Sequence, residues 1–209
     1  MPRRPDMPGL DRDSLADDPL EQFAAWWERA VAEVPLCDAM TLATVDSLGM
    51  PDARMVLLKG FGPDGFRFFT NRESAKGKQL ATHPDAALVI YWRELDRQVR
   101  VRGQVAELKP EESDAYFATR ARDSQLGAWA SPQSRPLGDR GELEELLREA
   151  TQRFETGEVP RPPHWGGYLL HPDRIEFWQG QVGRLHDRFA YERVPEEYGG
   201  PWRCQRLGP

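Results

Sequence analysis

Residues 40–108 alternate between short, strand-like stretches and tight turns, and no other feature of the sequence constrains the fold as strongly. The turns include Asp46-Ser47-Leu48-Gly49 and Pro63-Asp64-Gly65, whose residue types favour chain reversal. Strands are expected over residues 40–45, 53–59, 66–70, 86–92 and 98–108. Because strands that follow one another through short turns pair antiparallel, the sequence predicts an antiparallel barrel rather than a parallel nucleotide-binding sheet.

Helical stretches are interspersed with these strands. Asp18 can cap a helix, Pro19 suits its first turn, and apolar residues recur at helical spacing until Pro35 ends it. Further helices are expected over residues 74–82, from 110 through 124 and over 138–154, and late strands over 168–178, 188–194 and 202–207. The expected fold class is mainly β with added helices (α+β), in a single domain over residues 18–209 that follows a flexible arm at residues 1–17.

Charge and composition argue against several classes of protein. The net charge of −6 opposes general attraction to nucleic acid. No apolar run approaches the roughly 20 residues that cross a bilayer, and no apolar stretch follows the basic N-terminus as it does in a secretory signal. Cys37 and Cys204 lie far apart without metal-ligand spacing, so we expect two free thiols, no metal site and a cytoplasmic protein.

Two segments place cations where a small anion could bind. Arg54 and Lys59 lie at the two ends of an otherwise apolar strand and on its opposite faces. Such cations either contact a ligand at the mouth of a barrel or simply reach solvent from the ends of the strand. Ser74 can cap the helix that begins there, and Lys76 follows in its first turn. Free N–H groups, a hydroxyl and a lysine form an anion site, although this pattern is also common in plain strand–turn–helix connections.

Two further groups of polar side chains recur at regular spacing. Tyr116, Arg120 and Ser124 are separated by four residues each, so on one continuous helix they share a face that suits a phosphate ester or simply faces solvent. In an extended segment, Arg184 and His186 point the same way as Arg188. Three such groups are costly to bury without an anion, so this segment is a candidate ligand site.

Together, in this order and at these separations, the segments resemble the pyridoxine 5′-phosphate oxidase family. The resemblance covers residues 10–209, nearly the whole chain. The stretches that carry it include Arg54-Met55-Val56-Leu57-Leu58-Lys59, Phe69-Thr70-Asn71, Arg97-Gln98-Val99, Gln133-Ser134, Trp165-Gly166-Gly167-Tyr168, Ile175-Glu176-Phe177-Trp178-Gln179-Gly180 and Arg184-Leu185-His186-Asp187-Arg188.

The resemblance implies an antiparallel split β-barrel that forms a homodimer with FMN at the interface. The FMN contacts it implies are Arg54, Met55, Val56, Leu57, Leu58, Lys59, Phe69, Thr70, Ser74, Lys76, Gln98, Gln133, Ser134, Trp178 and Arg188. The substrate contacts it implies are Lys59, Tyr116, Arg120 and Ser124 on the phosphate, with Arg184 and His186 over the pyridine ring as the catalytic pair.

The reaction implied by the resemblance is the oxidation of pyridoxamine 5′-phosphate or pyridoxine 5′-phosphate to pyridoxal 5′-phosphate, with O2 as acceptor and H2O2 as product. Two alternatives remain: a related FMN oxidase of another ring substrate, of the phenazine-pathway type, and a non-catalytic flavin- or pyridoxal-phosphate-binding protein. One departure from the family pattern is Ala75, where many members carry an arginine that contacts the flavin phosphate. Arg72 is a candidate to replace that cation. The N-terminal segment also lacks the lid sequence found in some members.

Overall fold

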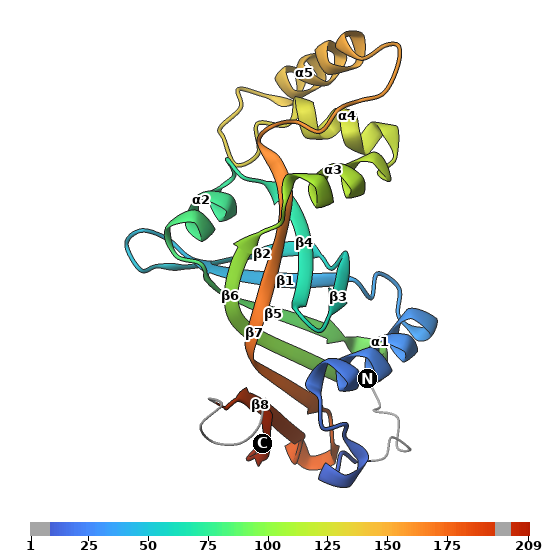
Figure 1. The fold of residues 1–209 in the computed structure, drawn as a ribbon, viewed down its shortest axis with the longest axis vertical. Helices are drawn as coiled ribbons and strands as arrows, with labels where there is room; N and C mark the ends of the chain where they lie inside the picture. The colour runs from blue at the N-terminus through green and yellow to red at the C-terminus, as the bar shows by residue number, and fades with distance from the viewer. Residues whose placement is uncertain (1–8, 195–201) are drawn as a thin grey trace.

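The computed structural model describes residues 9–194 and 202–209 (Figure 1). Its centre is a nine-stranded antiparallel sheet with the order β2-β1-β5-β6-β7-β4-β3, to which β8 is added beside β7 and β9 beside β8. The strands are β1 (Ala39–Val45), β2 (Pro51–Leu57), β3 (Gly60–Gly62), β4 (Gly65–Asn71), β5 (Asp85–Trp92), β6 (Arg97–Glu107), β7 (Trp165–Gln179), β8 (Asp187–Arg193) and β9 (Trp202–Leu207). The helices are α1 (Pro19–Glu33), α2 (Ala75–Thr82), α3 (Pro110–Ala118), α4 (Arg122–Ala130) and α5 (Arg140–Arg153). The sheet curls into a half-barrel, which confirms the predicted split-barrel class.

Strand alternation decides which face of the sheet forms the core. Along β6, Val99 and Val101 are buried whereas Arg100 and Arg102 are exposed, because successive side chains of a strand point to opposite faces. A β-bulge after Arg102 bends β6 against β7. At Gly103, a β-carbon would lie 1.9 Å from the carbonyl oxygen of His171, so no larger residue fits this crossing without displacing the backbone.

Helix α1 covers the core at one side of the sheet. Its N-cap is Asp18, whose carboxylate accepts a hydrogen bond from the Leu20 amide at 2.7 Å, as the sequence predicts. Phe23 and Trp26 are buried in the hydrophobic core. The Phe23 ring lies edge-on to Phe66 at 4.9 Å, so α1 is fixed by aromatic packing against β4.

The expected flexible arm is packed against the rest of the chain wherever it is described. Leu10 and Leu15 each retain 7% of their surface and belong to the core. The Leu10 amide donates a hydrogen bond to the Asp187 carboxylate at 3.0 Å. Two buried leucines and this hydrogen bond thus hold residues 9–17, where the sequence predicts a flexible arm; residues 1–8 lie outside the described part.

The helix expected to continue through Tyr116 and Ser124 is wrong, because α3 ends at Ala118 and α4 begins only at Arg122. Ala121 adopts an extended backbone between the two helices. The Gln125 side chain donates a hydrogen bond to the carbonyl of Phe117 at 3.0 Å, and this carbonyl also accepts from the Arg120 amide at 3.2 Å, so both bonds hold the turn between the helices. Helices α3, α4 and α5 gather at one end of the molecule, and β8 and the C-terminus lie at the other (Figure 1).

The other predicted elements are confirmed with shifted bounds. Strand β2 ends at Leu57 rather than at residue 59, β3 is an additional short strand, and β7 is longer than expected at both ends. Cys37 and Cys204 are free thiols, as predicted. Within residues 9–194 and 202–209, no helix has the length and apolar character needed to cross a membrane, and no cluster of His, Cys, Asp or Glu is suited to a metal ion.

Candidate active site

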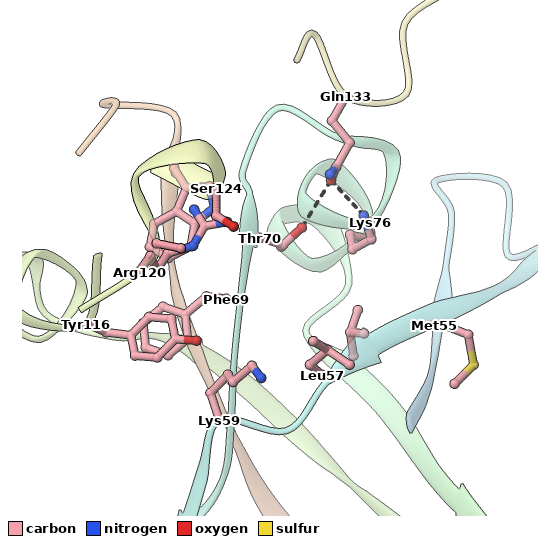
Figure 2. Close-up of a pocket in the computed structure, with 13 residues that line it drawn as sticks. Met55, Leu57, Lys59, Phe69, Thr70, Lys76, Tyr116, Arg120, Ser124 and Gln133 are labelled. Carbon is pink, nitrogen blue, oxygen red and sulfur yellow. Dashed lines mark hydrogen bonds between the residues drawn. The ribbon is translucent and has the colours of Figure 1, made fainter. Parts of the chain in front are cut away.

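A cavity of about 490 Å³ opens beside β2 and β4, next to the turn between α3 and α4 (Figure 2). This volume is typical of small-molecule sites, which run from about 300 to 1,000 Å³. The cavity is lined by Met55, Val56, Leu57, Lys59, Phe69, Thr70, Lys76, Tyr116, Arg120, Ala121, Ser124, Gln133 and Trp165. Within this described lining there are three cationic side chains and no carboxylate, so the cavity is suited to an anionic ligand.

The first cationic pole of the cavity contains Arg120, with Tyr116, Ser124 and Lys59 around it (Figure 2). Arg120 lies in the turn between α3 and α4, and its guanidinium carbon is 4.8 Å from the centre of the Trp165 ring. Its Nη1 atom is buried and has no hydrogen-bond partner in the described part of the chain. Burial lowers the pKa of Arg120, because desolvation disfavours the charged guanidinium. A bound phosphate would supply the missing acceptor.

Stacked aromatic rings hold this pole in place. The ring of Phe69 lies 3.9 Å from that of Tyr116 at an angle of 16°, and 5.4 Å from that of Trp165 at 11°. These rings come from β4, α3 and β7, so the stack ties the helical end of the molecule to the sheet. The stack fixes the Tyr116 ring with its hydroxyl on the side of the ring that faces the cavity, where the Lys59 ammonium group also lies (Figure 2).

Lys59 is the one cavity cation that has a carboxylate partner among the described residues. Its ammonium group lies 2.7 Å from the Asp38 carboxylate, and both side chains are 27% exposed. Asp38 was not predicted as a site residue, because its only link to Lys59 in the sequence is the pairing of β1 with β2. An anion that binds Lys59 must therefore share it with Asp38.

The second cationic pole contains Lys76, in the first turn of α2. Its ammonium group donates to the side-chain oxygen of Gln133 at 2.8 Å, and the Thr70 hydroxyl donates to the same oxygen at 3.1 Å (Figure 2). Lys76 is 8% exposed, and burial followed by the nearby Arg54 charge lowers its pKa. Ser74 caps the helix by accepting from the Gly77 amide at 3.3 Å, as predicted.

Two predicted cations near this pole are engaged elsewhere. Arg54 does not line the cavity, and its guanidinium contacts Asp52, Thr44 and, at 2.9 Å, Gln79. Arg72 also lies outside the lining; its Nε atom is 2.9 Å from the Glu107 carboxylate, which makes an ion pair although the angle does not give that buried N–H a hydrogen bond. Arg72 therefore does not supply the cation that Ala75 lacks.

A second group of predicted site residues lies on the outer face of β6, β7 and β8. Gln98 is paired with Trp178, and Trp178 with Arg188, so the three residues form one row across the strands. The His186 ring lies 4.7 Å from the Trp178 ring. The amide N–H of Gln181 donates to His186 Nδ1 at 3.1 Å, so the neutral imidazole carries its proton on Nε2.

Arg184 precedes this row in a turn rather than in an extended strand. It ends a short 3-10 turn (Val182–Arg184) with a φ of 64°, next to Gly183 with a φ of 69°. The prediction that Arg184, His186 and Arg188 share one extended segment is therefore wrong for Arg184, because the chain reverses before β8 begins. Arg184 is exposed at the tip of this reversal.

Within one chain, the two groups are not brought together. Strand β7 runs from Trp165 in the cavity to Trp178 in the row, and at roughly 3.3 Å per residue this separation is on the order of 40 Å along the strand. Figure 1 shows the two ends of β7 near opposite ends of the molecule. We call the cavity the first half-site, and the row of Gln98, Trp178, His186 and Arg188 with Arg184 the second half-site. Of the remaining predicted residues, Leu58 is buried in the core and Ser134 is exposed with a φ of 68°.

Family models match most of the chain. Residues 27–153 match the model described as pyridoxamine 5′-phosphate oxidase. Residues 165–209 match a second model, described as the pyridoxine 5′-phosphate oxidase C-terminal dimerisation region. The first half-site draws on both matches, because Trp165 lies in the second, and the row of the second half-site extends from Gln98 in the first match to β7 and β8 in the second.

Individual relatives agree over nearly the full length. Proteins called pyridoxine/pyridoxamine 5′-phosphate oxidase from Synechocystis sp. and Cupriavidus necator are each 54% identical over 202 residues, which is 96% of this chain and 92% and 93% of theirs. Among solved structures, PhzG from Burkholderia lata 383 in complex with tetrahydrophenazine-1-carboxylic acid is 32% identical, with a TM-score of 0.86 over 94% of this chain and 95% of that one. An FMN-binding protein from Nostoc punctiforme has a TM-score of 0.72 over 93% of this chain and 100% of its own; at 20% identity it shows the fold alone.

Proposed function

The chain belongs to the pyridoxamine 5′-phosphate oxidase family, and on that premise we propose that it oxidises pyridoxamine 5′-phosphate or pyridoxine 5′-phosphate to pyridoxal 5′-phosphate with FMN, releasing H2O2. The observation that carries the proposal is the pair of cationic poles in one cavity, Arg120 with Lys59 and Lys76 with the N-terminus of α2. Two phosphorylated molecules, a cofactor and a substrate, would each neutralise one pole.

The residues present fit FMN. Lys76 is a buried cation without a carboxylate partner among the described residues. A phosphate bound at the N-terminus of α2 would give it an anionic partner. Thr70 and Gln133 would hold the phosphate side with it, and Met55, Val56, Leu57, Leu58, Lys59 and Phe69 would hold the ring. Bound FMN supplies the two-electron oxidation of the substrate and the transfer of those electrons to O2.

The substrate phosphate would bind at the first pole. Arg120, Tyr116 and Ser124 offer it a guanidinium and two hydroxyls, and the buried, unpaired Nη1 of Arg120 is the donor most in need of an acceptor. Asp38 would keep Lys59 in place until the phosphate arrives. The aromatic stack of Phe69, Tyr116 and Trp165 would exclude water on this side of the substrate.

The second half-site would act on the substrate ring. His186 would donate from Nε2 to an acceptor on the ring, since its Nδ1 already accepts from the backbone of Gln181. Arg184, at an exposed turn, would lie over the ring and orient it. Gln98, Trp178 and Arg188 would complete the cofactor site, with Arg54 and Ser74 near the phosphate.

A homodimer would bring the half-sites together. The second half-site lies in or beside the segment that matches a dimerisation region, and it is too far along β7 to complete the cavity of its own chain. Met55 and Leu57 on the edge strand β2 are 61% and 45% exposed, and a partner subunit would cover them. FMN would then bind at the interface, with each chain contributing one half-site to each of two cavities.

The likeness to PhzG favours one alternative, an FMN oxidase of a larger carboxylated ring. The phosphate pole distinguishes the two, because Tyr116 and Ser124 add hydroxyl donors around Arg120 that suit the three oxygens of a phosphate. A cytoplasmic location stays a prediction from the two free thiols.

The test is turnover in air. The purified chain is loaded with FMN, freed of excess flavin and mixed with pyridoxamine 5′-phosphate, while the absorbance of pyridoxal 5′-phosphate and the release of H2O2 are followed together. We expect both to rise in step. Flavin binding without turnover would point to another ring substrate, and a protein that binds no flavin would contradict the proposal.

A further inference from the structure

A buried carboxylate lies beside the second half-site with no role in the function proposed above. Glu176 lies on the same face of β7 as Trp178, since the two are separated by two residues along the strand, and it is only 3% exposed. Three arginine side chains cover it: Arg188 from β8, Arg100 from β6 and Arg174 from β7 itself. Burying a charged carboxylate destabilises the fold unless hydrogen bonds and opposite charges compensate it, so the geometry of these contacts shows which arginine Glu176 serves.

The strongest of the contacts is with Arg188. Its Nε and Nη2 atoms both donate to Oε1 of Glu176, at 3.0 and 2.9 Å. Arg100 and Arg174 reach Oε2 only at 3.4 and 3.5 Å, and Arg174 has a closer partner in Glu192 at 2.6 Å. The carboxylate therefore holds one guanidinium in a defined orientation and merely neighbours the other two.

The orientation leaves part of Arg188 free to bind a ligand. Its Nη1 atom donates to the carbonyl of Gly208 at 2.9 Å, next to the last residue of the chain. Among the described residues these bonds use three of the five guanidinium N–H groups, so one N–H on Nη1 and one on Nη2 remain for a planar or anionic acceptor. Register places Arg188 directly beside Trp178 in the second half-site.

We infer that Glu176 is a positioning residue for the cofactor: it fixes the Arg188 guanidinium so that the two remaining N–H groups of Arg188 are preorganised for the flavin bound by the partner subunit. This inference rests on the proposed function. Glu176 does not touch the ligand itself, and it acts by removing the rotational freedom of Arg188 and by offsetting the repulsion among three neighbouring guanidinium groups.

The experiment measures the FMN dissociation constant of the apo-protein by quenching of flavin fluorescence. Glu176→Gln keeps the shape of the side chain and one acceptor oxygen but loses the charge. We expect FMN affinity to fall by about ten- to hundredfold, the range of one charge-assisted hydrogen bond. The matched control is Arg174→Gln, on the same face and beside the same carboxylate, for which we expect FMN affinity within about threefold of wild type because its main partner is Glu192.

A double-mutant cycle separates positioning from a general effect on stability. If Glu176 acts through Arg188, then Glu176→Gln has no further effect on FMN affinity once Arg188→Gln is present. Equal losses in both backgrounds, or a Glu176→Gln variant that binds FMN like wild type, would overturn the inference. Should Glu176→Gln fold poorly, Glu176→Asp retains the charge but not the reach, and we expect it to weaken FMN binding with a Tm near that of wild type. A wild-type protein that binds no FMN would overturn the proposed function as well, which distinguishes the two failures.

Discussion

Replacing Arg120 by leucine should separate substrate recognition from stability. A charge-assisted hydrogen bond to a phosphate contributes about 1.5–3 kcal/mol, which corresponds to a roughly 10- to 150-fold loss of kcat/KM for a phosphorylated substrate. The folded protein loses the contact of Arg120 with the Trp165 ring but also loses a buried Nη1 that has no partner in the described residues. The second change removes a desolvation penalty of about 1–3 kcal/mol, so the two effects on stability nearly cancel.

The assay compares pyridoxamine 5′-phosphate with unphosphorylated pyridoxamine at saturating FMN. For Arg120→Leu we expect kcat/KM to fall for the phosphorylated substrate only, while Tm stays within about 4 °C of wild type. Arg122→Leu is the matched control, because Arg122 lies two residues away, bonds the backbone carbonyls of Phe154 and Gly157, and does not line the cavity. An equal loss with both substrates would refute the assignment of Arg120 to the phosphate.

Three further results are expected. Burial lowers the pKa of Lys76, so its ammonium group is charged below this lowered pKa and loses its charge as pH rises through it. FMN affinity should decline over the same pH range. Lys76→Arg should remove this alkaline decline in FMN titrations, since a guanidinium stays protonated to about pH 12. Arg184→Ala should lower turnover at least about tenfold while FMN affinity is unchanged, and equal loss of both would show that Arg184 serves the cofactor. Nitrogen NMR of His186 at neutral pH should show the proton on Nε2, whereas a proton on Nδ1 would contradict the hydrogen bond from Gln181.

Local sequence signals were sufficient for most of the fold. Asp18 and Ser74 cap helices as their positions predict, and the turns at residues 46–49 and 63–65 connect antiparallel neighbours. The break between α3 and α4 has no such signal, because neither glycine nor proline lies between residues 118 and 122. It is favoured instead by the Gln125 side chain, which reaches back to Phe117, a tertiary hydrogen bond that periodicity does not register.

The candidate site was predictable in its residue types but not in its arrangement. Tyr116, Arg120 and Ser124 do meet at one cavity, although through a turn rather than along one helical face. Ion pairs between residues far apart in the sequence could not be foreseen. Arg72 was the candidate to replace the arginine that many family members carry where this chain has Ala75, but Arg72 pairs with Glu107 instead. The separation of the two half-sites also depends on the length of β7, which alternation alone underestimated.

The most direct test of the shared site is complementation between two impaired variants. Arg120→Leu impairs the first half-site and Arg184→Ala the second, so a hybrid dimer of the two chains has one intact cavity and one cavity with both defects. Chains co-expressed with different affinity tags allow the hybrid to be purified. If each cavity is completed by the partner subunit, the hybrid should turn over pyridoxamine 5′-phosphate at about half the wild-type rate. A hybrid no more active than its two parent variants would contradict a site shared between chains.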